Sequence, residues 1–192
     1  MPMLRLPFAA LMFALALATG LAAMPAGAEV VVKNARFAAV QQVDGRPFRM
    51  IGHGLFRYMI WDAYAGAYYQ AEGFPRPAPQ SGNVPRRLEL EYFHAIEAGD
   101  FAEVTRDTLR DQLGAADFRS LEPALSAFNA RYRDVSPGDR YALTWDGETL
   151  SLALNGESLY ARPEPALADA LFGIWLGGAP LGDGFRDDLL GR

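Results

Sequence analysis

"GDRYALTWDGETLSLALNGESLY", residues 138–160, has the clearest β pattern in the sequence. Apolar and polar residues alternate through it, and the dipeptides Asp146-Gly147 and Asn155-Gly156 interrupt the alternation. Asp-Gly and Asn-Gly are preferred pairs in type I′ turns, which join the strands of β-hairpins. The stretch therefore predicts a three-stranded antiparallel meander with a type I′ turn at each dipeptide.

Helical patterns lie on both sides of this meander. Downstream, residues 165–176 carry apolar side chains at helical spacing, and a short last helix is expected at about 185–190. Upstream, Asp100 stands three residues before Glu103, which predicts a capping box at the start of a helix. Gly114 is the expected end of that helix.

The remaining elements complete an α+β order. A second helix is expected at about 118–132, and Pro123 fits it only in the first turn or at a kink. Asp44-Gly45 predicts a further hairpin turn, and residues 72–85, rich in proline, predict a loop. Extended segments are expected at residues 30–32, 37–43, 48–58, 61–70 and 87–93. Strands, helices, strands and a helix in this order predict helices on one side of an antiparallel sheet.

The first 28 residues have the pattern of a secretory signal peptide. Arg5 precedes the apolar run 8–21, and Ala26-Gly27-Ala28 provides small residues for cleavage before Glu29. The alternative, a membrane anchor, needs about 20 apolar residues. We therefore expect an exported, periplasmic protein whose single domain spans residues 29–192, with no membrane span after cleavage of the signal.

Composition narrows the chemistry and the partners of this domain. The chain has no cysteine, which removes thiol catalysis and disulfides. Loss of Arg5 with the signal leaves a net charge of −6, and no basic patch stands out, so nucleic acid is not an expected partner. The two histidines, His53 and His94, are 41 residues apart, and no phosphate-binding or hydrolase motif is present. We expect neither a metal site nor a cofactor.

A candidate binding stretch, "GHGLFRYMIWDAYAGAYYQ" at residues 52–70, holds six aromatic rings among glycines and alanines. As a strand, it would carry Tyr64 and Tyr68 on one face and a row of alanines on the other, where a helix or ligand approaches closely. With Arg57 nearby, the tyrosines form a candidate binding site for a carboxylate or phenolate that carries an apolar body. The alternative is that the tyrosines only fill the core of a sheet.

Several motifs in order resemble the bacterial chalcone isomerase-like proteins, which include exported members. The similarity runs from about Phe48 to Gly191. It is carried by "GHGLFR" (52–57), "WDAYAGAY" (61–68), "YRDVSPGDRYALTW" (132–145), "LALNG" (152–156) and "ALFGIWLGGAPLGDGFRDDLLG" (170–191). The resemblance implies an α+β open-faced sandwich, a large antiparallel sheet covered by a layer of helices. Plant members of the family either close a chalcone into a flavanone or bind fatty acids through an Arg and a Tyr.

The resemblance also implies which residues would act here. Gly66 and Tyr68 match the enzyme's strand, but the enzyme's threonine corresponds to Ala63, and the place of the family's arginine is taken by Phe56, with Arg57 one residue later. We therefore expect a non-catalytic protein that binds an amphipathic carboxylate or a lipid-like molecule, such as a fatty acid or a flavonoid. The ligand-binding residues are predicted to be Arg57, Tyr64 and Tyr68. Two alternatives stay open: an intramolecular lyase acting on a chalcone-like enone, and an envelope module that binds another protein, whose identity is unknown.

Overall fold

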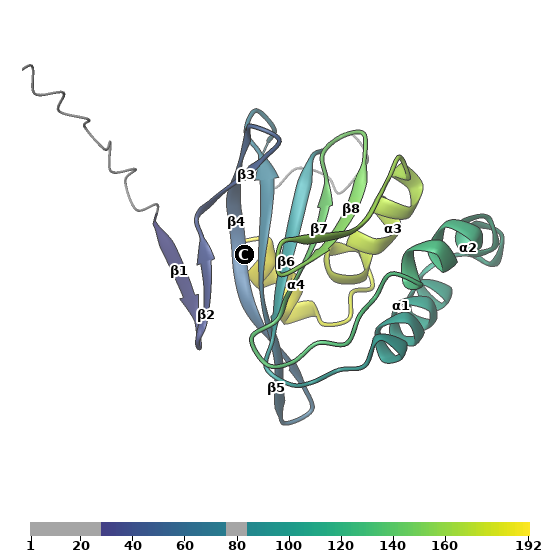
Figure 1. Ribbon diagram of the computed structural model, residues 1–192, viewed down its shortest axis with the longest axis horizontal. Coiled ribbons are helices and arrows are strands. Elements are labelled where there is room, and N and C mark those ends of the chain that lie inside the picture. Colours follow the sequence, from purple (N-terminus) through teal and green to yellow (C-terminus); the bar gives the residue numbers. More distant parts are fainter. Residues whose placement is uncertain (1–27, 76–83) are drawn as a thin grey trace, which may run out of the picture.

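A computed structural model describes residues 28–75 and 84–192 (Figure 1). In these ranges the chain forms strands and helices that alternate in groups. The strands are β1 (Glu29–Val32), β2 (Ala35–Ala38), β3 (Val40–Val43), β4 (Arg46–Tyr58), β5 (Trp61–Ala71), β6 (Arg86–Tyr92), β7 (Arg140–Trp145), β8 (Leu150–Leu154) and β9 (Glu157–Arg162). The helices are α1 (Ala98–Gln112), α2 (Ala115–Asn129), α3 (Pro165–Leu176) and α4 (Asp183–Leu189).

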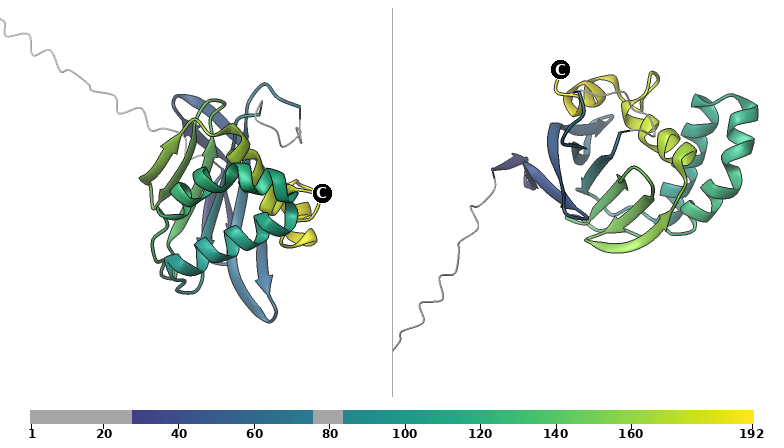
Figure 2. Two further views of the ribbon diagram at one scale, coloured as in Figure 1. Left: turned by 90° about the vertical axis from the view of Figure 1, so that its right-hand side faces the viewer. Right: turned by 90° about the horizontal axis from the view of Figure 1, so that it is seen from above.

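A seven-stranded antiparallel sheet organises the molecule, with its strands in the chain order β3-β4-β5-β6-β7-β8-β9. The sheet curls, and the four helices lie on its inner side (Figure 2). Helix α4 contacts β4 and β5, α3 contacts β8, and α1 and α2 pack against α3. β1 and β2 form a separate pair on the outer side. The predicted α+β open-faced sandwich is confirmed.

The turns between strands follow the sequence prediction at two of three places. Asp44-Gly45 and Asn155-Gly156 have positive φ at both residues, as type I′ turns require. The prediction for Asp146-Gly147 was wrong, because only Gly147 has positive φ and four residues, 146–149, connect β7 to β8. The Asp146 carboxylate accepts hydrogen bonds from the backbone N–H groups of Glu148 and Thr149, and these bonds hold the longer loop.

Helices α1 and α2 both begin about three residues before the positions that the sequence predicts. Helix α1 starts at Ala98, so Asp100 lies in its first turn and forms no capping box. The Ala98 N–H instead donates to the carboxylate of Asp134, 36 residues away, at 2.8 Å. Helix α2 starts at Ala115, which leaves Pro123 in the middle of the helix and not in its first turn. Gly114 does mark the boundary, between α1 and α2.

Most of the alanines on β5 face neither a helix nor a cavity, in contrast to the prediction, and Ala63 at the start of the strand is the exception. Ala65, Ala67 and Ala71 pack in a buried cluster with Phe37 of β2 and Phe48 of β4. Their small side chains therefore let the β1–β2 pair approach the outer face of the sheet.

On the inner face of the sheet, glycines let helix α4 approach the strands closely. A Cβ atom on Gly66 would lie 2.7 Å from the Phe185 ring of α4, and one on Gly54 would lie 2.7 Å from Cβ of Asp188. Gly52 is tighter still, because its Cβ would meet backbone atoms of the α4 C-terminus. These glycines, which lie on β4 and β5, let α4 sit directly on the sheet.

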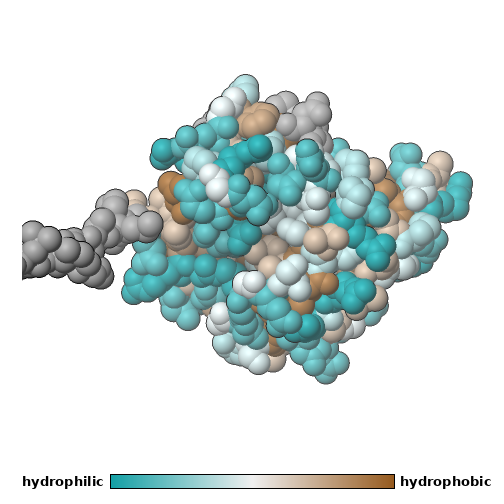
Figure 3. Space-filling model, turned by 45° about the horizontal axis from the view of Figure 1, so that its top comes forward, coloured by the Kyte–Doolittle hydropathy of each residue, from teal (hydrophilic) through white to brown (hydrophobic). Residues whose placement is uncertain are grey.

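The predicted signal peptide lies almost wholly outside the described residues, as does most of the predicted loop at 72–85. No helix within residues 28–75 and 84–192 is long and apolar enough to cross a membrane. The face of the molecule seen in Figure 3 is mostly hydrophilic, and its apolar residues form small, separate patches.

Candidate functional site

An apolar cavity of about 540 Å³ lies between the sheet and the helices. Its walls come from β4, β5 and β6 on one side and from α1 and α3 on the other. The lining residues are Phe56, Tyr58, Ala63, Tyr64, Tyr92, Ile96, Asp100, Phe101, Val104, Thr105, Tyr132, Ile174, Trp175 and Leu181. The volume and the apolar lining are typical of small-molecule binding sites.

Aromatic packing fixes the sheet side of this cavity. The Phe56 and Tyr64 rings stack, with centroids 4.8 Å apart and an interplanar angle of 11°. Both rings meet Phe185 of α4 edge-on at 5.6 Å. Tyr92 completes the wall, with its ring edge-on to Tyr64 at 5.5 Å. Because these rings contact one another, the wall is preformed rather than shaped by a ligand.

Tyr64 supplies a polar group in this apolar wall. The Trp175 indole N–H donates to the Tyr64 hydroxyl oxygen at 3.0 Å. Burial raises the pKa of Tyr64, and it raises the pKa of Tyr92 well above its usual range. Both phenols therefore stay protonated at neutral pH, and the Tyr64 hydroxyl can donate its own proton to a ligand acceptor.

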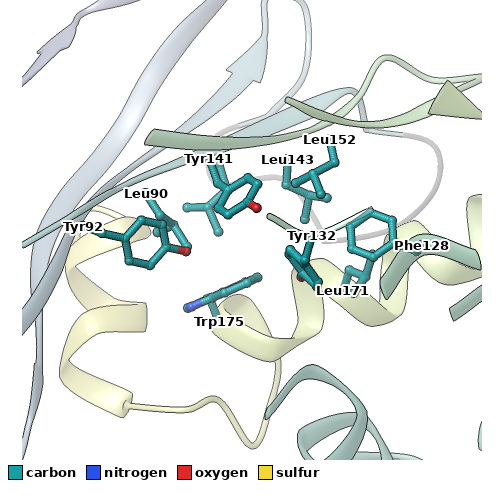
Figure 4. Close-up of a pocket in the computed structure, with 10 residues that line it drawn as sticks. Leu90, Tyr92, Phe128, Tyr132, Tyr141, Leu143, Leu152, Leu171 and Trp175 are labelled. Carbon is teal, nitrogen blue, oxygen red and sulfur yellow. The ribbon is translucent and has the colours of Figure 1, made fainter. Parts of the chain in front are cut away.

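A smaller pocket of about 30 Å³ lies behind the cavity, toward β7 and β8 (Figure 4). It shares Tyr92, Tyr132 and Trp175 with the larger cavity. In Figure 4, Trp175 of α3 lies opposite Tyr92 and Tyr141 of the sheet, with leucines around them. A second, smaller apolar space therefore lies beside the main cavity, among leucine and aromatic side chains.

Charge is nearly absent from the cavity lining. Asp100 is the one charged residue among the fourteen that line it, and Asp100 itself is exposed at the mouth. No Arg, Lys or His is among these fourteen residues. Within residues 28–75 and 84–192, no three His, Cys, Asp or Glu side chains gather in a group that could hold a metal ion.

The structure places the three predicted ligand-binding residues apart. Only Tyr64 lines the cavity. Arg57 lies near the end of the β4–β5 hairpin, where its exposed guanidinium donates to Asp62 at 2.8 Å. Tyr68 is fully buried, and its hydroxyl accepts a hydrogen bond from the Gln70 amide at 3.0 Å. The expectation that all three line one cleft is thus not met.

The alternation of side chains along β4 explains the position of Arg57. Phe56 pairs with Tyr64, but the next pair is Arg57 with Asp62, so Ala63 has no partner on β4. Phe56, which pairs with Tyr64, lines the cavity, so Arg57 as the next residue of β4 faces the other side, and the bulge places Asp62 of β5 opposite it. At the two places where the resemblance would put the enzyme's arginine and threonine, the cavity is lined by Phe56 and Ala63.

Sequence reasoning missed most of the cavity, including Phe56, Tyr92 and Trp175. Trp175 is 111 residues from Tyr64 in the chain and reaches it only because α3 packs against the inner side of the sheet. The segment "FGIWLGG" (172–178) contains this tryptophan, but neither its apolar spacing nor the family resemblance that it carries places Trp175 beside Tyr64. A contact over this separation has no local sequence signal.

A curled antiparallel sheet covered by helices, with an apolar cavity between the layers, defines a class of α+β sandwich proteins. The sequence model of one such family, described as chalcone isomerase-like, matches residues 29–191. The chain belongs to the chalcone isomerase-like family.

A solved structure supports the same fold. The chain is similar to a fatty-acid binding protein of Arabidopsis thaliana, with 18% sequence identity and a TM-score of 0.62. The similarity covers 85% of this chain and 96% of the Arabidopsis chain. No curated protein matches the sequence.

Buried tyrosines predict a loss of stability at alkaline pH. Burial raises the pKa of Tyr68 to about 12, against 10 for an ordinary tyrosine. The unfolded chain therefore ionises first, so this stabilisation is complete below pH 10 and is lost as the pH rises toward 12. The difference corresponds to about 3 kcal/mol for Tyr68 alone. Urea unfolding at pH 9, 10 and 11 should show falling stability, with a shallower fall in Tyr68→Phe. If the free energy of unfolding falls equally with pH in both proteins, ionisation of Tyr68 does not cause the loss of stability.

Proposed function

We propose that this protein binds a small lipid-like molecule, without catalysing a reaction on it, in the cavity between the sheet and α1 and α3. The observation that carries the proposal is the cavity itself, with about 540 Å³ of space and a lining that is almost wholly apolar and aromatic. The fatty-acid binding protein with the same fold adds support, since that protein binds a ligand of this chemical class.

The lining favours an uncharged head group over the carboxylate that the sequence suggested. A carboxylate buried without a cationic partner loses hydration that the protein does not replace. Arg57 would have to leave Asp62 to provide such a partner, and Tyr68 would have to leave its buried position. Tyr64 is therefore the predicted residue that contacts the ligand, as a hydrogen-bond donor to an alcohol, ester or carbonyl oxygen.

A comparison of two ligands with the same chain tests this proposal. We expect 1-dodecanol to displace the neutral fluorescent probe N-phenyl-1-naphthylamine at least tenfold more effectively than dodecanoate at pH 8. The reason is that dodecanoate carries a negative charge and 1-dodecanol does not. In the cavity this charge is either buried without a cationic partner or held close to the carboxylate of Asp100. Tighter binding of dodecanoate, lost in Arg57→Ala, would instead support an anchored carboxylate. No displacement by either compound would count against a lipid-like ligand.

We also propose that the chain is exported to the periplasm, as the pattern of residues 1–28 suggests. Cleavage after Ala28 would leave Glu29 as the first residue, and β1 begins there. The intact mass of the protein from its own host tests this, since a retained leader would add the mass of 28 residues.

A further inference from the structure

The end of the β4–β5 hairpin exposes four consecutive large apolar residues, Tyr58, Met59, Ile60 and Trp61, here called the hairpin tip. Their exposed fractions are 66%, 81%, 86% and 60%. In Figure 1 this hairpin extends below the ends of the neighbouring strands, so the tip projects from the body of the protein. Soluble domains rarely expose apolar residues in one contiguous group without a binding role.

Turn geometry does not require these residues. Two other turns of the sheet use Asp44-Gly45 and Asn155-Gly156, the polar and flexible pairs that positive φ favours. At the tip, Met59 adopts a φ of 54°, which non-glycine residues other than Asn and Asp seldom adopt. The chain thus keeps an apolar side chain where Asn or Gly would fit the backbone better.

The tip is continuous with the mouth of the cavity. Tyr58 belongs to both, because it lines the cavity and is mostly exposed. Val104 of α1 and Leu181 also line the cavity and are 53% and 39% exposed. Among the described residues, six of the eight exposed large hydrophobic side chains lie at the tip or this mouth, and only Val31 and Val40 lie elsewhere.

Two cations lie at the base of the tip. Lys33 and Arg57 both pair with the carboxylate of Asp62, and hydrogen bonds from Lys33 and then Arg57 lower the pKa of Asp62. Two positive charges and one negative charge leave an excess of one positive charge at the base of the tip, while Asp100 places a negative charge at the cavity mouth. Trp and Tyr side chains prefer the boundary between the lipid chains and water. Lys and Arg side chains beside them reach the depth of the lipid phosphate groups, with which their charges interact favourably.

We propose that the hairpin tip inserts into the interface of a phospholipid bilayer, so that the cavity mouth faces the lipid and the ligand passes between them without crossing water. This inference rests on the proposed lipid-like ligand. Four residues at a turn insert only into the interface and do not span the bilayer. A protein partner would explain the exposed rings as well, but it would not explain why they continue into the mouth of a lipid-binding cavity.

Vesicle partitioning tests the proposal with the whole mature chain. The probe is 100 nm vesicles of phosphatidylcholine, and binding is measured by co-sedimentation. The test variant, Met59→Asn with Ile60→Ser, alters only tip residues that do not line the cavity, and Asn tolerates positive φ. The control, Val31→Ser with Val40→Ser, removes two exposed apolar residues away from the tip.

We expect the tip variant to partition at least tenfold more weakly than the wild type, and the control variant to partition within twofold of it. Both variants should bind N-phenyl-1-naphthylamine in solution within twofold of the wild type. Equal partitioning of the tip variant, or no partitioning of the wild type, would overturn the proposal. A concentration-dependent dimer lost in the tip variant would also overturn it, in favour of a second copy of the chain. If vesicles bind and the probe does not, membrane docking stands and the cavity proposal fails.

Discussion

Replacement of Gly52 with alanine should destabilise the protein by about 3 kcal/mol or more. The new Cβ atom would lie 2.1 Å from the Asp188 carbonyl oxygen, 2.7 Å from that of Leu189 and 2.8 Å from the Gly191 nitrogen. All three are backbone atoms, so no side-chain rotation relieves the overlap and α4 must move away from the sheet. Because Phe185 of α4 supports Phe56 and Tyr64, probe binding should weaken as well.

Gly184→Ala is the matched control, since this glycine lies in α4 and its Cβ would meet nothing within 4 Å. We expect no loss of stability there, and a gain of about 0.5–1 kcal/mol from the better helix former. Urea unfolding followed by circular dichroism measures both variants. Equal stability of Gly52→Ala and the wild type would show that α4 does not sit on β4 as described.

Replacement of Ala63 with tryptophan should abolish binding in the cavity. Ala63 lines the cavity at the bulge of β5, and an indole there would take up space that the ligand needs. We expect the affinity for N-phenyl-1-naphthylamine to fall at least a hundredfold, while the melting temperature changes by only a few degrees. The reason is that the indole fills space which the unliganded fold leaves open.

Ala161→Trp makes the same change at an exposed position of β9 that does not line the cavity. Its probe affinity should match that of the wild type. If Ala63→Trp binds the probe as tightly as Ala161→Trp does, the probe binds elsewhere and the assignment of the site is wrong.

The strand layout could be predicted from local sequence because each strand carries its own alternation. Residues 138–160 form the meander β7-β8-β9, and Asn155-Gly156 forms its type I′ turn. The type I′ turn predicted at Asp146-Gly147 does not form, because the Asp146 carboxylate accepts a hydrogen bond from the backbone of its own loop. The capping box predicted at Asp100 does not form, because the carboxylate of Asp134, distant in the sequence, accepts the hydrogen bond at the start of α1.

The site could be predicted only in part, because it depends on which face each strand turns inward. Tyr64 was identified from strand parity. Arg57 is one residue from Phe56, which pairs with Tyr64, and adjacent residues of a strand face opposite sides, so Arg57 lies outside the cavity. Sequence pattern gives no signal for the bulge at Ala63, which places Asp62 opposite Arg57 while Ala63 lines the cavity. The sequence likewise does not determine what covers the alanines of β5, because a helix and the β1–β2 pair would both need small side chains on the sheet to pack closely.

Native mass spectrometry of the protein purified from its own host tests directly whether the cavity holds a lipid-like ligand. We expect a non-covalent 1:1 complex with a small apolar molecule that carries no carboxylate, and loss of that adduct in Ala63→Trp but not in Ala161→Trp. A wild-type chain that carries no adduct, and that binds neither 1-dodecanol nor N-phenyl-1-naphthylamine when they are added, would contradict it.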